Sequence, residues 1–322
     1  MTRTTLVAAW LATSLLVAVS ARADERYALV ITGAPGGEEY RERYLAWERD
    51  MSGVLVEGLG FAREHVELLS GATDDPERSS TRAHVQREVE RLKSRARADD
   101  IIFIVLMGHG SADGGVAKFN LPGPDLTSAE WGSLLHDVPG RVVVVNTSGA
   151  SFPFMADLAT RGHIVITATD SVAQRYDTVF PAQLLAALND PAADLDKNGR
   201  VSVWELFVYT ARRVARHYEQ QGLLATERSL LDDSGDGVGT EAGNDTGTDG
   251  ALARATYLER EAVEVNADAE MAALIARRRS LEERAEQLRQ KKSSMPQEAW
   301  EREFEQLMIE LARVSHRIRA GS

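Results

Sequence analysis

The sequence predicts an α/β fold in which a mostly parallel sheet is flanked by helices, followed by a helical hairpin or coiled coil. Short apolar runs alternate with amphipathic stretches over residues 26–188, as expected for parallel strands joined by crossover helices. The central run, Ile101–Leu106, has no polar break, which is typical of a strand buried on both faces. After Ala251 the composition changes to mainly Ala, Glu, Arg and Leu, which favours long helices.

Five short apolar runs predict the strands of this sheet. They are rich in β-branched residues and are bounded by Gly, Asp, Asn or Ser. In chain order they are Arg26–Thr32, His65–Leu69, Ile101–Leu106, Arg141–Asn146 and Gly162–Thr169. Between the third and fourth, Val116–Gly123 is expected to form a hairpin or a loop.

The helices are predicted from apolar residues spaced by three or four positions. They are Glu38–Gly58, Thr81–Arg97, Thr127–His136, Val179–Leu188 and Val201–Gln221. Thr127 followed by Glu130 has the spacing of a capping box, in which each side chain binds the other residue's backbone N–H.

Composition and charge limit the classes of function. The chain has 322 residues and 43% apolar residues, enough to bury a core. Its 49 acidic residues outnumber its 37 basic ones, and a net charge of −12 argues against non-specific nucleic-acid binding. It has no cysteine, which excludes disulfides, thiolate metal sites and catalysis by a thiol.

Residues 1–23 have the pattern of a secretory signal peptide. Arg3 supplies a positive start, Leu6–Val19 an apolar centre, and Ala21-Arg22-Ala23 a cleavage site. The alternative is an uncleaved anchor, but the apolar run is short for a span of about 20 residues. We therefore expect a secreted or periplasmic protein that is free of the membrane after cleavage.

A histidine and a serine follow two neighbouring strands of the predicted sheet. Gly108-His109-Gly110 lies just beyond Ile101–Leu106, and Ser148 lies just beyond Arg141–Asn146. The carboxyl ends of parallel strands meet at one edge of a sheet, where open α/β proteins bind ligands. We therefore expect His109 and Ser148 to lie at the same edge. The alternatives are that Ser148 is a turn serine bonded to nearby backbone and that His109 is a histidine packed at the sheet edge.

This arrangement resembles the caspase and legumain (C13-like) group of cysteine endopeptidases. The likeness covers about residues 26–236 and includes GHIVITATDS and AALNDPAADLDKNGRVSVWELFVY. It implies a six-stranded, mostly parallel sheet flanked by helices, in a domain spanning residues 24–230. It also implies that His109 is the catalytic histidine, that Gly110 gives a backbone N–H to the oxyanion, and that Ser148 replaces the cysteine. A shifted alignment would place Ser151 there instead.

The serine leaves two functions open. A serine hydroxyl is far less acidic than a thiol and needs an oriented base, usually held by a carboxylate. Asp113 and Asp170 are candidates for that carboxylate. The first function is a pseudopeptidase whose cleft holds a peptide or protein. The second is an active endopeptidase or hydrolase that uses Ser148 and His109.

Residues 194–205 match the twelve-residue EF-hand calcium loop. The predicted ligands, by loop position, are Asp194 at one, Asp196 at three, Asn198 at five, Arg200 at seven through its carbonyl, Ser202 at nine and Glu205 at twelve. Gly199 stands at six, where the loop turns sharply. Ca²⁺ is therefore the expected cofactor, with weak affinity of about 10⁻⁴–10⁻³ M as in extracellular modules. The alternative is an acidic, solvated turn.

Residues 231–250 are rich in glycine and acids and predict a mobile linker. Asp232, Asp233 and Asp236 could instead bind a cation, although no glutamate stands at position twelve counted from Asp232.

Residues 251–322 predict two helices that form an antiparallel hairpin about Pro296. Leucines at 274, 281 and 288 recur every seven residues. The apolar positions after Pro296 alternate spacings of four and three; they are Trp300, Phe304, Leu307, Leu311, Val314 and Ile318. The hairpin either docks on its own sheet domain or forms a coiled coil for self-association or a protein partner through residues 251–320.

Overall fold

The computed structural model describes residues 24–244, 248–259, 269–291 and 295–320. The proposed signal peptide, residues 1–23, lies outside them. The main sheet contains β1 (Arg26–Thr32), β2 (Val66–Leu69), β3 (Ile101–Met107), β7 (Arg141–Asn146), β8 (His163–Thr167), β9 (Leu230–Asp232) and β10 (Thr240–Glu241). A small antiparallel sheet contains β4 (Gly110–Asp113), β5 (Val116–Phe119) and β6 (Leu126–Thr127). The helices are α1 (Glu38–Gly53), α2 (Arg82–Arg95), α3 (Ser128–Leu135), α4 (Pro153–Leu158), α5 (Phe180–Leu188), α6 (Val203–Gln220), α7 (Ala251–Arg254), α8 (Ala269–Gln290) and α9 (Gln297–Ala320).

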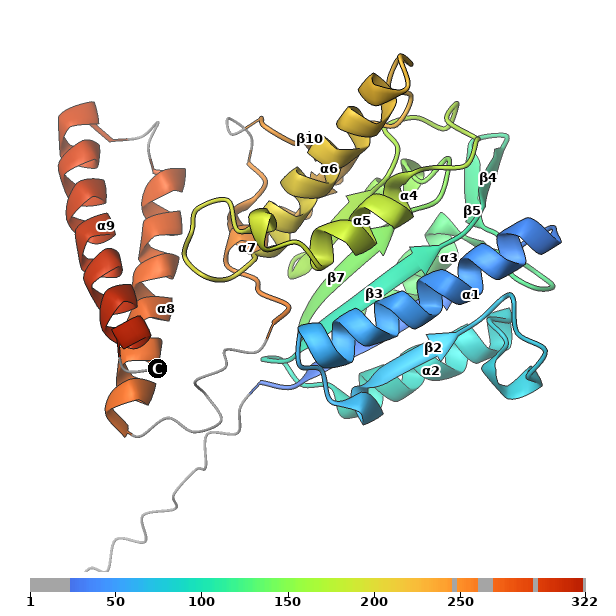
Figure 1. Ribbon diagram of the computed structural model, residues 1–322, viewed down its shortest axis with the longest axis horizontal. Helices are drawn as coiled ribbons and strands as arrows, with labels where there is room; N and C mark the ends of the chain where they lie inside the picture. Colours follow the sequence, from blue (N-terminus) through green and yellow to red (C-terminus); the bar gives the residue numbers. More distant parts are fainter. Residues whose placement is uncertain (1–23, 245–247, 260–268, 292–294, 321–322) are drawn as a thin grey trace, which may run out of the picture.

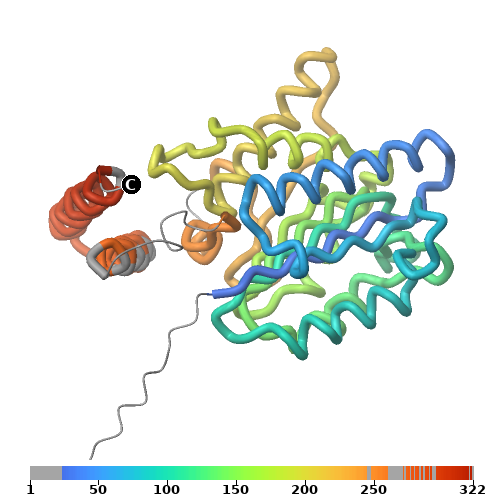
Figure 2. Tube along the Cα trace, turned by 60° about the horizontal axis from the view of Figure 1, so that its bottom comes forward, coloured from blue at the N-terminus to red at the C-terminus, as the bar shows by residue number. Residues whose placement is uncertain are grey.

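The main sheet is mostly parallel and lies between two layers of helices (Figure 1). Its strand order is β10-β9-β8-β7-β3-β1-β2, and only β9 and β10 run antiparallel to their neighbours. Alternate residues of each strand face opposite layers, so that Val145 packs with α1, α5 and α6 while Val144 packs with α2, α3 and α4. Figure 2 shows α1 on one side of the strands and α2 on the other. The mostly parallel α/β fold is thus confirmed.

Two helices begin at a capping box. Thr127 and Glu130 form the predicted capping box at the start of α3. Ser202 and Glu205 form another at the start of α6, which the sequence analysis did not anticipate. The predicted helix over residues 38–58 divides into α1 and a π-helical turn at Val54–Gly58.

The sheet has seven strands rather than six, because residues 230–232 and 240–241 form the strands β9 and β10. β9 lies antiparallel to β8 and forms a hairpin with β10. Leu230 and Leu231 are buried on opposite faces of the sheet. The Asp232 carboxylate accepts backbone N–H groups of the turn that follows, including Gly235 and Gly237. Between Asp232 and Gly237, the acid- and glycine-rich composition therefore encodes a hydrogen-bonded turn.

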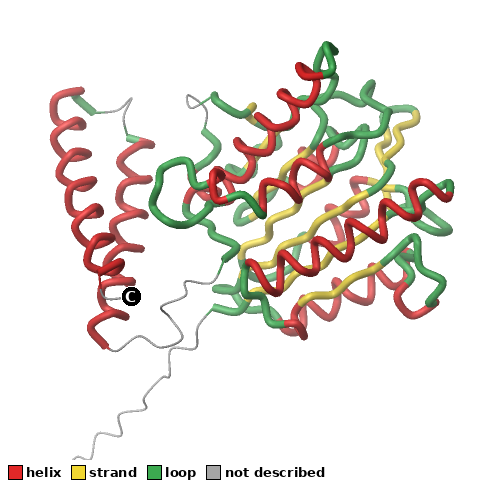
Figure 3. The backbone as a smooth tube through the Cα atoms, in the orientation of Figure 1, coloured by secondary structure: helices red, strands yellow, loops and turns green. Residues whose placement is uncertain are grey.

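The C-terminal helices α8 and α9 form the predicted hairpin and lie beside the sheet domain (Figures 1 and 3). They have their own apolar core, made by Ile275, Leu281, Ala285, Leu288, Leu307, Val314 and Ile318. α8 also contacts α7. In the described residues no helix is both long enough and apolar enough to span a membrane.

Candidate functional site

The structure places His109 and Ser148 at the same edge of the sheet. β3 and β7 are adjacent and parallel, with Leu106 paired with Asn146, so the segments that follow both strands leave the sheet side by side. A side chain at Gly110 would lie within 2.6 Å of the Ser148 hydroxyl. Only glycine therefore permits the two segments to approach this closely.

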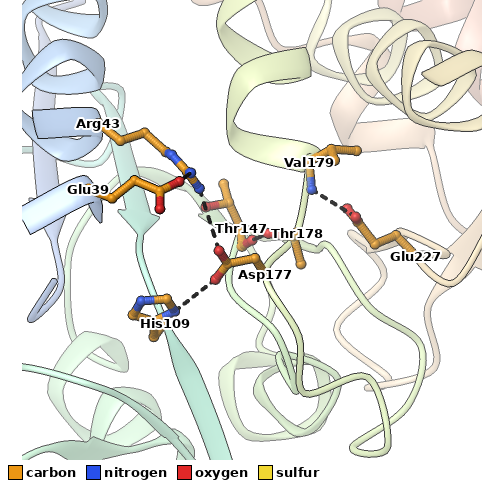
Figure 4. Close-up of polar contacts among 8 residues, drawn as sticks. All are labelled: Glu39, Arg43, His109, Thr147, Asp177, Thr178, Val179 and Glu227. Carbon is orange, nitrogen blue, oxygen red and sulfur yellow. Dashed lines mark hydrogen bonds and ion pairs between the residues drawn. The ribbon is translucent and has the colours of Figure 1, made fainter. Parts of the chain in front are cut away.

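His109 is oriented by a carboxylate from a third segment (Figure 4). Asp177, in the loop after β8, has an oxygen 3.0 Å from His109 Nδ1. Tyr40 of α1 packs edge-on against the imidazole, with the ring centres 4.5 Å apart. The Tyr40 hydroxyl also donates to Asp177, and this hydrogen bond is the main reason why the pKa of Tyr40 is raised. Arg43, one turn further along α1, lies 3.5 Å from the other Asp177 oxygen.

Neither carboxylate expected from the sequence has this role. Asp113 is exposed at the end of β4, and Asp170 forms an ion pair with Arg228. Asp177 belongs to no motif. The only sequence signal for it is that its loop follows the strand next to β7, and so lies at the same edge of the sheet.

Ser148 is fully buried and is bonded within its own turn. Its hydroxyl donates to the side-chain oxygen of Asn146 at 2.7 Å, and its backbone N–H donates to the same atom at 3.0 Å. Within the described part of the chain, Ser148 and His109 are not hydrogen-bonded to each other. Ser151, the other candidate, is buried and shares a 3.0 Å hydrogen bond with the Thr169 hydroxyl.

The loop that carries Asp177 also covers the turn around Ser148. The Ala150 N–H donates to the Gln174 carbonyl, and the Thr178 hydroxyl donates to the Thr147 carbonyl. Glu227 fixes the end of this loop by accepting the Val179 N–H at 2.8 Å (Figure 4). The same loop therefore carries Asp177, which contacts His109, and covers the turn that contains Ser148.

The EF-hand-like loop brings three of its predicted ligands together. Oxygens of Asp194, Asp196 and Glu205 lie within 4.8 Å of one another. Glu205 accepts the N–H groups of Leu195 and Asp196 with one oxygen and bonds Ser202 with the other, so its carboxylate joins both ends of the loop.

The remaining loop residues also suit a hard cation. Asn198 Oδ1 accepts the Arg200 N–H, and Gly199 adopts the left-handed φ of +90° that the turn requires. The Arg200 guanidinium lies 3.7 Å from the centre of the Tyr257 ring. Burial raises the pKa of Asp196, and the negative charge of Glu205 raises it further. A bound divalent cation would offset this repulsion between the two carboxylates. The donor set therefore fits calcium.

A second acidic cluster joins Asp232, Asp236 and Asp249 within 4.8 Å. Burial raises the pKa of Asp249 to about 6. Asp233, expected to be in such a cluster, instead accepts the N–H groups of Gly250 and Ala253 at the start of α7.

Fold and site define an α/β protein with a His–Asp pair and a buried serine at the carboxyl edge of its sheet. Among solved structures, the chain is similar to protein GSU0716 from Geobacter sulfurreducens, with 17% identity and a TM-score of 0.44 over 65% of this chain and 92% of that one. It is also similar to caspase-1 from Spodoptera frugiperda, with 9% identity and a TM-score of 0.42 over 65% of this chain and 86% of that one. No protein-family model and no curated protein matches the chain.

Proposed function

We propose that this chain is an exported caspase/legumain-like peptidase homologue without turnover, which binds a peptide at its cleft and calcium at residues 194–205. The state of Ser148 carries the proposal for the cleft. Attack by a serine requires a hydroxyl whose proton can pass to a nearby base. Here the hydroxyl and the N–H of Ser148 both donate to Asn146, and the residue is fully buried.

The second candidate is an active hydrolase that uses Ser148 and His109. One observation favours it: Asp177 holds His109 as an orienting carboxylate holds a catalytic histidine. A movement of the loop over Ser148 would be needed to bring its hydroxyl to the imidazole.

An irreversible serine-directed phosphonate probe separates the two candidates. We expect no labelling of the wild-type protein, with or without calcium. Labelling that disappears in Ser148→Ala but persists in Ser151→Ala would establish the active hydrolase instead. Profiling with peptide libraries in the presence of calcium then tests for cleavage directly.

Exposed apolar side chains in the segments at the carboxyl edge of the sheet support a peptide ligand. They are Val116, Phe152, Tyr176, Leu223 and Leu224, which are 47%, 40%, 87%, 56% and 90% exposed. Val116, Phe152 and Tyr176 come from the segments that follow β3, β7 and β8, respectively. Leu223 and Leu224 lead into β9, and the first residue of β9 pairs with the last residue of β8. Large apolar side chains gathered at one edge favour contact with apolar residues of a ligand. We expect a peptide array to show binding that weakens in Tyr176→Ala and is unchanged in Ser148→Ala.

Calcium binding at residues 194–205 is the second part of the proposal. Convergence of Asp194, Asp196 and Glu205 supports it. Titration calorimetry should give one site with a dissociation constant of about 10⁻⁴–10⁻³ M. Glu205→Gln should lose the heat of binding while keeping the helix cap, because glutamine also serves at that capping position.

Export and the role of the hairpin complete the proposal. Cleavage after Ala23 would release the mature chain outside the cytoplasm, which N-terminal sequencing of protein recovered from the periplasm or medium would test.

The α8–α9 hairpin would form the surface for self-association or for a protein partner. Light scattering at several protein concentrations would test self-association, because the mean mass rises with concentration when the protein associates.

A further inference from the structure

Residues 250–259 lie between the sheet domain and the hairpin in the sequence, and one end of this segment rests on the EF-hand-like loop. Ser202 forms an antiparallel bridge with Tyr257, and the Val203 N–H donates to the Thr256 carbonyl at 2.8 Å. The Arg200 guanidinium stacks on the Tyr257 ring at 3.7 Å. Loop positions seven to ten thus contact the 250–259 segment directly.

A further side-chain bond joins the same two stretches of chain. The Glu259 carboxylate accepts the Val201 N–H at 3.0 Å. Tyr257 and Leu258 are 9% and 3% exposed, so this end of the segment is buried between its neighbours. Its placement therefore depends on the conformation of the loop.

The other end of the segment is held by Asp233, which lies outside the loop, and by Trp204 at loop position eleven. Asp233 accepts the N–H groups of Gly250 and Ala253 at 2.7 Å each. The Arg254 guanidinium lies 3.9 Å from the centre of the Trp204 ring. The end that contacts loop positions seven to ten is the one at Thr256–Glu259, which leads toward the hairpin.

The hairpin lies near both ends of this segment. Helix α8 contacts α7, which forms the first end. Burial raises the pKa of Tyr257 most, and the charge of Glu282 on α8 raises it next. Tyr257 is therefore contacted by the loop on one side and influenced by the hairpin on the other.

Negative charge accumulates around this junction. Oxygens of Asp194, Asp196 and Glu205 lie within 4.8 Å of one another, and the Glu259 carboxylate accepts the Val201 N–H of the same loop. These carboxylates repel one another in a loop whose backbone must keep its register for the contacts with Tyr257 to persist. A divalent cation bound between them would remove that repulsion.

We propose that calcium in the 194–205 loop fixes the 250–259 segment, and through it the orientation of the α8–α9 hairpin on the sheet domain. The inference rests on the proposed calcium site and adds a consequence of binding: the metal couples the loop to the surface offered by the hairpin. Without the metal the loop loses its register, the contacts of Arg200 and Tyr257 weaken, and the hairpin samples several orientations.

The absence of cysteine allows a direct test on the full chain. Ser94 of α2 and Glu303 of α9 are exposed, and Ser94→Cys with Glu303→Cys provides unique positions for a donor and an acceptor dye. Single-molecule energy transfer is recorded in calcium and in chelator, with calorimetry in parallel. Calcium should narrow the distribution of transfer efficiencies, and chelator should broaden it.

Three variants locate the coupling. Glu205→Gln should lose both calcium binding and the narrowing. Tyr257→Leu, which lies outside the loop and removes the stacking with Arg200, should still bind calcium but keep a broad distribution of transfer efficiencies. Asp236→Asn, in the other acidic cluster, should behave as the wild type. A thermal melt of each variant in chelator confirms that it is folded.

Two failures are distinguishable. Calcium binding by calorimetry with an unchanged distribution of transfer efficiencies would overturn the coupling and leave the calcium site intact. Narrowing in Tyr257→Leu equal to that of the wild type would do the same. Loss of the narrowing in Asp236→Asn would also overturn it. A complete absence of calcium binding would remove the proposed calcium site and the coupling together.

Discussion

Asn146 and Ser148 form a closed pair within one turn: a single amide oxygen of Asn146 accepts both the hydroxyl, at 2.7 Å, and the backbone N–H, at 3.0 Å, of Ser148. Both residues are fully buried. In the proposed function, Ser148 stands at the position of the nucleophile. The Asn146 oxygen therefore stabilises the turn and occupies the hydroxyl that attack would require.

Removal of the Asn146 amide should destabilise the protein more than removal of the Ser148 hydroxyl. Asn146→Ala leaves two buried donors of Ser148 without a partner, and we expect a loss of about 2–4 kcal/mol in the free energy of unfolding. Ser148→Ala removes one donor and one bond together, with an expected loss of about 1 kcal/mol. Urea denaturation measures both. Equal losses would contradict the assigned role of Asn146.

Replacement of Asp177 should change the titration of Tyr40. The carboxylate accepts a hydrogen bond from the Tyr40 hydroxyl, and this raises the pKa of Tyr40. Asp177→Asn removes the charge, so the pKa of Tyr40 should fall toward its ordinary value. NMR of ring-labelled tyrosine as a function of pH measures the change.

Tyr209 provides the matched control for this titration. Its hydroxyl is bonded to Asp190, which raises its pKa by the same mechanism at a distant position. Asp177→Asn should leave the Tyr209 titration unchanged. A shift of both tyrosines, or of neither, would show that the Tyr40–Asp177 bond is absent in solution.

Much of the sheet could be predicted because each strand carries its own apolar run. The predicted Arg26–Thr32 strand has the bounds of β1, and the predicted Arg141–Asn146 strand has those of β7. β9 could not be predicted, because it has only three residues and is followed at once by aspartates and glycines. Its strand conformation comes from pairing with β8, which is a tertiary contact.

The site was predicted where residues follow strands, and missed where they come from long loops. His109 and Ser148 were placed at one edge because parallel strands deliver their ends there. Asp177 was missed because its position depends on how residues 168–179 cross that edge, and no local pattern encodes this path. The bond from Ser148 to Asn146 was missed as well, because the sequence does not indicate which of several partners a turn hydroxyl selects.

Calcium should raise the melting temperature of the protein. At a calcium concentration about 100 times the dissociation constant, mass action stabilises the folded state by about 2.7 kcal/mol. Each kcal/mol corresponds to about 2–4 °C for a domain of this size class. Glu205→Ala and Glu205→Gln should both abolish the rise, while Asp236→Asn should retain it. Identical melts of the wild type in calcium and in chelator would exclude a stabilising site.

The free energy of unfolding should fall as the pH rises from about 4 to about 6, because the Asp249 carboxyl loses its proton in the folded protein over this range. Burial raises the pKa of Asp249 from 3.8 to about 6, so between these values the folded state binds more protons than the unfolded chain. The resulting stabilisation is complete below pH 3.8 and is lost as the pH rises through about 6.

Asn at position 249 reproduces the protonated form and isolates this effect. The side-chain oxygen of Asn still accepts the N–H groups of Asp233 and Ser234 that Asp249 bonds. Allowing for partial solvent contact, Asp249→Asn should stabilise the protein by about 1–2 kcal/mol at pH 7.5. The gain should vanish near pH 4, where both side chains are neutral in the folded state. Urea denaturation in chelator at the two pH values measures it, with the exposed Asp113→Asn as a control. A gain that is the same at both pH values would show that the carboxyl titrates normally in the folded protein.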